Sequence, residues 1–163
     1  MGIGAVGGEA ASMGRLYDAL VMFLQEEDWK FTPMPAETAA LMTFNCENAS
    51  YLCYARVREE RQQAMFYAIY PLRAPADRRA EVAEFVALVN YGLALGNMEL
   101  DMDDGEMRYK TSADVGVAQF SLPLLRALMQ TCIATADRYF PGYTALLYSG
   151  VTPQQAVAQV EGA

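Results

Sequence analysis

The fold is decided by residues 41–70, LMTFNCENASYLCYARVREERQQAMFYAIY, in which three strands follow one another. From Leu41 onward apolar and polar residues alternate, which is typical of a strand with one buried face. We expect a turn at Asn48 and Ala49 and a second strand that runs to about Arg58. In this register one face of the hairpin pairs Met42 with Ala55, Phe44 with Cys53, and Cys46 with Tyr51.

A third strand is predicted after the charged turn at residues 59–62. Residues 65–70, MFYAIY, are apolar at successive positions, as in a strand of a sheet that is covered on both faces. Pro71 ends this strand because it lacks the backbone N–H that a sheet needs. Three strands joined by short turns predict an antiparallel sheet.

A first helix precedes these strands and is capped by Ser12. The acidic residues 26–28 end it, because their charges oppose the negative end of the helix. We expect a short strand at residues 29–31 and a loop at residues 32–35, TPMP. Residues 1–11 form a Gly-rich tail, and residues 12–163 form a single domain. One helical face carries Leu16, Ala19, Leu20, Phe23 and Leu24.

A second helix and a second hairpin follow. The helix spans residues 77–91 and ends at Gly92. Asp104-Gly105 is the strongest turn signal in the chain, and a two-residue loop there pairs Leu100 with Tyr109 and Met102 with Met107. The same register brings opposite charges together on the other face, for example Glu99 with Lys110.

The chain ends in helices. Ser121 precedes a long helix that we expect Pro141-Gly142 to break. A short helical turn then runs to Gly150, and Thr152 with Gln155 forms a capping box for a final helix. The fold class is therefore α+β, a twisted antiparallel sheet flanked by helices in the order α-β-β-β-β-α-β-β-α-α.

Charge and hydropathy exclude several classes of partner. The net charge is -8, which repels nucleic acid and anionic lipid at long range, so we expect neither a nucleic acid nor a membrane partner. No stretch approaches the roughly 18 apolar residues that span a bilayer, and the first residues lack the basic start of a signal peptide. The sequence predicts a cytoplasmic protein.

The side-chain chemistry argues against an enzyme. The chain has no histidine, which removes the commonest general base and transition-metal ligand. Cys46, Cys53 and Cys132 form no metal-binding or redox motif, and we expect free thiols. From Asp101 the spacing does not fit a calcium loop, because glycine falls at the fifth position instead of the sixth. We therefore expect no catalytic residues, no metal and no cofactor.

The apolar residues around the second hairpin have two interpretations. The chain holds ten methionines and ten tyrosines, and methionine suits adaptable binding surfaces. The same spacing is equally typical of core positions. The candidate interaction surface consists of Phe85, Val86, Val89, Met98, Leu100, Met102, Met107 and Tyr109.

Two segments resemble the bacterial YbjN family. The first is VNYGLALGNMEL, residues 89–100, which continues into DDGEMRY, residues 103–109. The second is DRYFPG, residues 137–142, followed by YSG at residues 148–150 and PQQA at residues 153–156. The resemblance runs from about Trp29 to Val160. It implies a fold similar to type III secretion chaperones, usually dimeric, in a family of sensory transduction regulators without known enzymatic activity.

These observations predict a non-enzymatic protein-interaction module, regulatory or chaperone-like. We expect a homodimer that binds an extended segment of another protein across an apolar surface, with residues 77–91 and 98–109 at the dimer interface. The alternative is a small-molecule sensor with a pocket lined by methionine and aromatic side chains.

Overall fold

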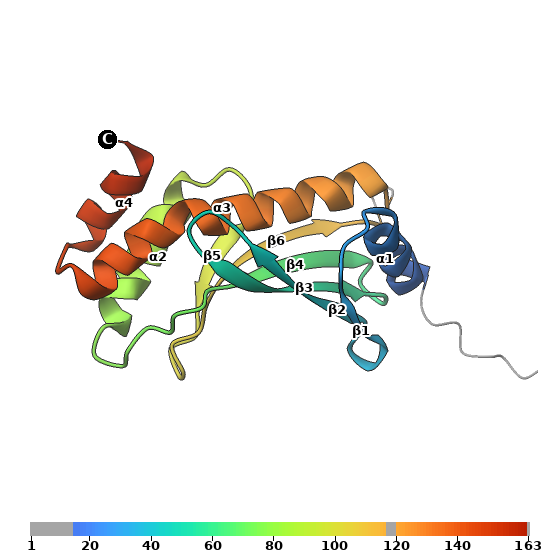
Figure 1. Ribbon diagram of the computed structural model, residues 1–163, viewed down its shortest axis with the longest axis horizontal. Helices are drawn as coiled ribbons and strands as arrows, with labels where there is room; N and C mark the ends of the chain where they lie inside the picture. The colour runs from blue at the N-terminus through green and yellow to red at the C-terminus, as the bar shows by residue number, and fades with distance from the viewer. Residues whose placement is uncertain (1–14, 117–119, 163) are drawn as a thin grey trace, which may run out of the picture.

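The elements appear in the predicted order in residues 15–116 and 120–162, the parts of the chain that this computed structural model describes (Figure 1). Ser12, predicted as a cap, and the predicted tail at residues 1–11 lie outside these ranges. The elements are α1 (Arg15–Glu26), β1 (Thr32–Met34), the 3-10 helix η1 (Pro35–Glu37), β2 (Ala39–Asn45), β3 (Ser50–Arg58), β4 (Gln63–Ile69), α2 (Arg79–Gly92), β5 (Asn97–Leu100), β6 (Met107–Asp114), α3 (Leu122–Tyr148) and α4 (Pro153–Glu161).

The strands form one antiparallel sheet in the order β1-β2-β3-β4-β6-β5. Figure 1 shows α3 running along the sheet, with α1 near one end and α2 beside α4 at the other. The helix α3 contacts β4 and β6, α1 contacts β3, and α2 contacts β5. The predicted α+β class, an antiparallel sheet flanked by helices, is confirmed.

A single core lies between the helices and one face of the sheet. Alternate residues of β3 point into it, and Tyr51, Cys53, Ala55 and Val57 are all buried. Burial of this apolar surface, at about 25 cal/mol per Å², is the main stabilising contribution. Phe23, Phe85, Leu125 and Met129 are among the helix side chains that meet these strands.

The register predicted for the β2–β3 hairpin is wrong by two residues. Met42 pairs with Cys53 and Phe44 with Tyr51, so residues 46–49 form the turn. The turn is wider because α3 holds it: the Asp137 carboxylate accepts hydrogen bonds from the backbone N–H groups of Asn48 and Ala49. A shift of two residues leaves every side chain on its predicted face.

The predicted two-residue loop at Asp104-Gly105 is also wrong. Leu100 pairs with Met107, so residues 101–106 form the loop. Gly105 has a φ of 79°, and a Cβ there would lie 2.1 Å from the carbonyl oxygen of Ala74. The Ala74 N–H in turn donates to the Gly105 carbonyl at 2.8 Å. The loop is longer because it docks on the segment that leads to α2.

The first strand lies at residues 32–34 rather than at residues 29–31. Pro33 pairs with Ala40 in β1, which is an edge strand, where a missing N–H on the solvent side costs no ladder hydrogen bond. Trp29 is instead half-buried and packs against the core, with its ring edge-on to Phe23 at 5.6 Å and to Phe44 at 5.4 Å. Aromatic packing therefore outweighs the alternation at residues 29–31.

The helix α3 is not broken at Pro141-Gly142 as predicted, and it continues to Tyr148. Proline has no N–H to give to the carbonyl of Asp137, one turn earlier. The Asn48 side chain donates to that carbonyl at 3.1 Å and replaces the missing helical bond. Gly142 provides room for α4, because a Cβ there would lie 2.7 Å from the carbonyl oxygen of Ala156.

Other local predictions are confirmed. The Ser121 hydroxyl accepts from the Leu124 N–H at 3.3 Å, and Thr152 with Gln155 forms both bonds of the capping box. The three cysteines are free.

Candidate protein-binding surface

The second face of the sheet carries apolar side chains that do not belong to the core. We call it the open face. Its larger apolar residues are Leu41, Leu52, Tyr54, Met65, Tyr67 and Ile69.

The open face contradicts the expectation of a sheet covered on both sides. Leu52 is 40% exposed, and Tyr54, Tyr67 and Ile69 are half-buried. Met65 is buried although no helix side chain of the core cluster packs on it; the Tyr67 hydroxyl contacts its sulfur at 3.4 Å.

At the β5–β6 end, the open face carries charges that are paired within the chain. Arg108 Nε donates to Glu99 Oε2 at 2.7 Å, and Lys110 forms an ion pair with the same carboxylate. Partial burial would raise the pKa of Glu99, but hydrogen bonds from Lys110, Arg108 and Asn97 outweigh it and lower this pKa. The Arg108 guanidinium also lies over the Tyr67 ring, 4.8 Å from its centroid. This end is fixed and largely neutralised.

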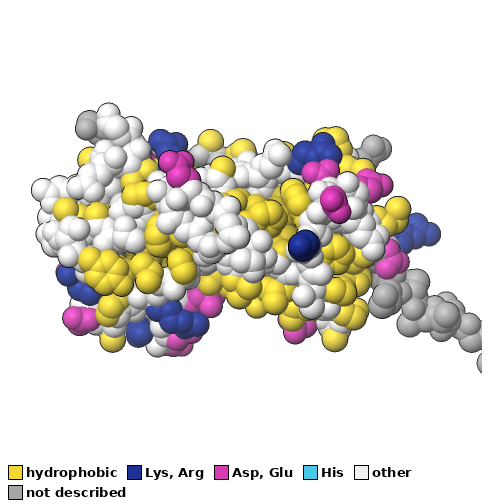
Figure 2. Space-filling view, viewed as in Figure 1, with side chains coloured by type: hydrophobic (Ala, Val, Ile, Leu, Met, Phe, Trp, Pro, Cys, Tyr) yellow, Lys and Arg dark blue, Asp and Glu magenta, His cyan; other side chains and the backbone are white. Residues whose placement is uncertain are grey.

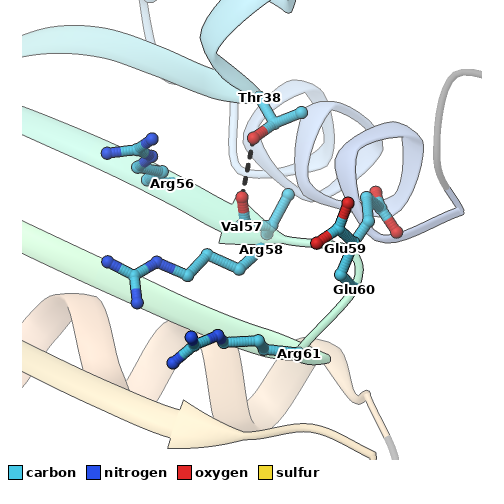
Figure 3. A pocket seen from close by; sticks show the side chains of 7 residues that line it. All are labelled: Thr38, Arg56, Val57, Arg58, Glu59, Glu60 and Arg61. Carbon is cyan, nitrogen blue, oxygen red and sulfur yellow. Dashed lines mark hydrogen bonds between the residues drawn. The ribbon is translucent and has the colours of Figure 1, made fainter.

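At the end of β3 the charges are different. A groove of about 500 Å³ is lined by Thr38, Arg56, Val57, Arg58, Glu59, Glu60 and Arg61 (Figure 3). We call it the arginine groove. Within the described residues, Arg56, Arg58 and Arg61 form no ion pair or side-chain hydrogen bond. Figure 3 shows their side chains extending to one side, away from Glu59 and Glu60.

Glu59 does not neutralise these arginines because α1 engages its carboxylate. The N–H groups of Leu16 and Tyr17 donate to it at 3.2 and 2.8 Å. A carboxylate at a helix N-terminus satisfies N–H groups that lack a helical partner and complements the helix dipole. The β3–β4 turn is thus bound to α1, and the guanidinium groups face solvent.

The edges of the sheet are less accessible than its open face. At the β5 edge, the Asn90 side chain donates to the Met98 carbonyl at 3.1 Å and accepts from the Met98 N–H at 2.8 Å. At the other edge, Pro33 removes a donor from β1. Both edges therefore disfavour the addition of a further strand.

An apolar groove lies between α1 and the β1 edge. It measures about 440 Å³ and is lined by Tyr17, Asp18, Val21, Met22, Pro33 and Pro35. Figure 2 shows hydrophobic side chains gathered over the end of the molecule where α1 and β1 lie. The Tyr17 hydroxyl is buried, and no hydrogen-bond partner satisfies it within the described residues. This groove is a second candidate contact surface.

The chain matches the YbjN family, described as "Putative bacterial sensory transduction regulator", over residues 17–145. It belongs to the YbjN family. The resembling residues 148–156 lie beyond this match. No curated protein matches the chain significantly.

Two solved structures share the fold of this YbjN-family chain. The crystal structure of YbjN from E. coli, a "putative transcription regulator", is 13% identical with a TM-score of 0.53, covering 68% of this chain and 78% of that one. The HopA1–SchA chaperone–effector complex contains a chain that is 13% identical with a TM-score of 0.50, covering 73% of this chain and 89% of that one. At this identity the likeness shows the fold alone.

Residues in the two segments that resemble the family hold secondary-structure elements in place. Asn90 protects the edge of β5, and Gly96, at a φ of 70°, would place a Cβ 2.6 Å from the Lys110 carbonyl oxygen. Asp137 holds the β2–β3 turn, and Gly142 admits α4. These residues position elements and carry no reactive group in a cleft.

The structure places most of the predicted interaction surface in the core. Phe85, Val89, Met98, Met107 and Tyr109 are buried where α2 meets β5 and β6. Val86 and Leu100 are half-buried, and only Met102 is largely exposed, at 54%. The core interpretation therefore holds for five of these side chains, since alternation does not distinguish core from interface.

Sequence reasoning missed the open face. Its signal is the alternate set in β3, Leu52, Tyr54, Arg56 and Arg58, which looks like a solvated strand face. The decisive information is the absence of ion-pair partners for the two arginines among the described residues, and this appears only in three dimensions.

The titratable groups in the core are held in their neutral forms. Burial raises the pKa of the Cys132 thiol to about 12, and that of Cys53 higher still. Burial likewise raises the pKa of Tyr143 and Tyr51 above the usual range. Such thiols are poor nucleophiles.

Two searches of the described residues are negative. They hold no group of three or more cysteine, aspartate or glutamate side chains that could bind a metal ion. They also include no helix long and apolar enough to cross a bilayer.

Proposed function

We propose that this YbjN-family chain is a non-enzymatic protein-interaction module, regulatory or chaperone-like, that binds another protein. The observation that carries the proposal is the open face, where apolar side chains lie outside the core beside arginines that form no ion pair with any described residue. Family membership supports a regulatory role, and the fold shared with a chain of a chaperone–effector complex supports binding to another protein. The free cysteines suit the reducing cytoplasm.

The size of the open face suits an extended segment of the partner. Strands β2, β3, β4 and β6 lie about 4.8 Å apart and rise about 3.3 Å per residue, which gives a face of roughly 400 Å². A stable interface buries about 800 Å² on each side. A partner that continues past β1 into the apolar groove beside α1 would gain the remaining contact area.

The proposal also includes a homodimer. The predicted contact residues on α2 and the second hairpin are mostly buried, but the same region exposes other apolar side chains. Leu88 is 36% exposed and Tyr91 is 96% exposed on α2, and Leu95 is 66% exposed just beyond it. We place the dimer contact on this side, away from the open face.

Site-specific photocrosslinking in the source cell tests the binding function. A photoreactive amino acid replaces Tyr54 on the open face, Met22 in the apolar groove, or Arg138 on the exposed side of α3 as control. We expect one defined protein adduct from Tyr54 or Met22 and none from Arg138. Adducts that are the same at all three positions would contradict the proposal.

Light scattering over a dilution series tests the dimer. The wild type should have the mass of two chains, and Tyr91→Asp should shift it towards one. Tyr148→Asp removes another exposed tyrosine, at the end of α3, and should leave the mass unchanged. A wild-type mass of one chain at every concentration would contradict the dimer without affecting the binding proposal.

A further inference from the structure

We infer that the arginine groove recognises an acidic, extended segment of the partner protein, and this inference rests on the proposed function. Elsewhere several basic side chains form ion pairs: Arg78 with Glu81, Arg108 and Lys110 with Glu99, and Arg126 with Glu27. Other basic side chains without an ion pair in the described residues, such as Lys30 and Arg138, are isolated, whereas Arg56 and Arg58 are neighbours on one strand face. In a chain with 20 acidic and 12 basic residues, internal partners are abundant. Adjacent guanidinium groups that have no ion-pair partner among the described residues provide a site for an external carboxylate.

The spacing of two arginines fits an extended ligand. Arg56 and Arg58 lie on the open face of β3 with Val57 between them, pointing into the core. Alternate residues of a strand are about 6.6 Å apart, and alternate side chains of an extended peptide have the same spacing. Two acidic residues separated by one residue can therefore reach both arginines at once. Guanidinium and carboxylate groups form paired, charge-assisted hydrogen bonds in this arrangement.

The surroundings of the groove define the rest of the ligand. Continuing along β3 from Arg56, the open face presents Tyr54 and Leu52, with Leu41 beside Tyr54 on β2. A segment that lies along β3 would meet these apolar side chains directly after the arginines. The expected ligand has two acidic residues followed by apolar residues, and it lies on the open face along β3 rather than at a sheet edge, because both edges are protected.

The charge of the whole chain favours a short acidic segment over a polyanion. The net charge is -8, so a nucleic acid or an anionic vesicle is repelled by the rest of the surface. Glu60 also lines the arginine groove, and Asp114 lines an adjoining groove that Arg58 shares. A segment with two carboxylates can avoid them.

Fluorescence anisotropy with two synthetic peptides tests the inference. The first peptide has two glutamates separated by a serine, then two leucines separated by a threonine; the second has glutamines in place of the glutamates. With the full chain at low salt, we expect the glutamate peptide to bind at least fivefold more tightly. Arg56→Gln or Arg58→Gln should remove this preference, and 300 mM salt should reduce it. Arg138→Gln loses one charge elsewhere and should preserve it.

Several results would overturn the inference. Equal affinity for both peptides would overturn the inference. If Leu52→Lys then reduced the affinity for both peptides, the proposed function would still be supported. If neither peptide binds, the inference is also wrong. The proposed function is then tested separately, by the crosslinking at Tyr54. Tighter binding of a single-stranded oligonucleotide or of phosphatidylserine vesicles through Arg56 and Arg58 would identify a polyanion site instead.

Discussion

The two faces of β3 differ in what determines their residues. On the covered face, Tyr51, Cys53, Ala55 and Val57 are at most 4% exposed and fill space between helices. On the open face, the intervening residues are half-buried or exposed, and they change from apolar to cationic along the strand. Internal packing explains the first set. Packing within the described residues does not explain the second set, so contact with a binding partner is the explanation that we propose.

The largest expected effect comes from adjacent residues on opposite faces of β4. Phe66→Ala removes a side chain that is 2% exposed and should reduce the free energy of unfolding by about 3–5 kcal/mol. Tyr67→Ala, on the open face, should cost about 1 kcal/mol. Urea denaturation measures both. Equal losses would mean that the open face is packed as tightly as the core.

A second comparison separates backbone strain from close packing. Gly105→Val should cost about 3 kcal/mol or more, because it combines a positive φ with a clash against Ala74. Gly150 has a similar φ of 67° but nothing within 4 Å of the position of a Cβ, so Gly150→Val should cost about 1 kcal/mol. Thermal denaturation of both variants checks the difference. Similar losses would show that docking of the loop on Ala74 contributes little.

The paired charges on the open face predict a pH dependence. The pKa of Glu99 is lower in the folded chain than its usual value of 4.5, so its stabilisation is present above that value and is lost as the pH falls through the folded pKa. Glu99→Gln should cost about 1 kcal/mol at pH 7, and this cost should decrease as the pH is lowered below 4.5. Glu60→Gln serves as control. A cost independent of pH would mean that the carboxylate charge is unimportant.

The smallest effect is expected at the centre of the open face. Leu52→Lys replaces a side chain that is 40% exposed and should change the free energy of unfolding by less than about 0.5 kcal/mol. It should nevertheless remove the crosslink formed from Tyr54. A large loss of stability would place Leu52 in the core and weaken the distinction between the two faces.

The sequence predicts which side of a strand is buried better than where a turn closes. In both hairpins the observed register differs from the predicted one by two residues, and every side chain stays on its predicted face of the sheet. Burial determines which face a residue occupies, whereas contacts with distant segments determine the length of the loop. Those contacts, from Asp137 to the first turn and from Ala74 to Gly105, are not visible in a local pattern. The local rule for Pro141 fails for the same reason.

The candidate site was harder to predict than the fold. Phe85 and Met98 occupy alternating or helical positions that suit a core and an interface equally well, and the structure buries both. Arg56 and Arg58 look like solvated charges in a sequence. Only the position of every carboxylate in space shows that they are unpaired within the described residues.

The bond from Asn48 to the carbonyl of Asp137 has an evolutionary consequence. Pro141 leaves that carbonyl without its helical donor, and a side chain from a turn distant in the sequence replaces it. The two positions should therefore be selected together, although they lie 93 positions apart in the chain. Among related chains we expect the proline and the asparagine to be retained or lost together. A family alignment in which they vary independently would show that the carbonyl tolerates solvent.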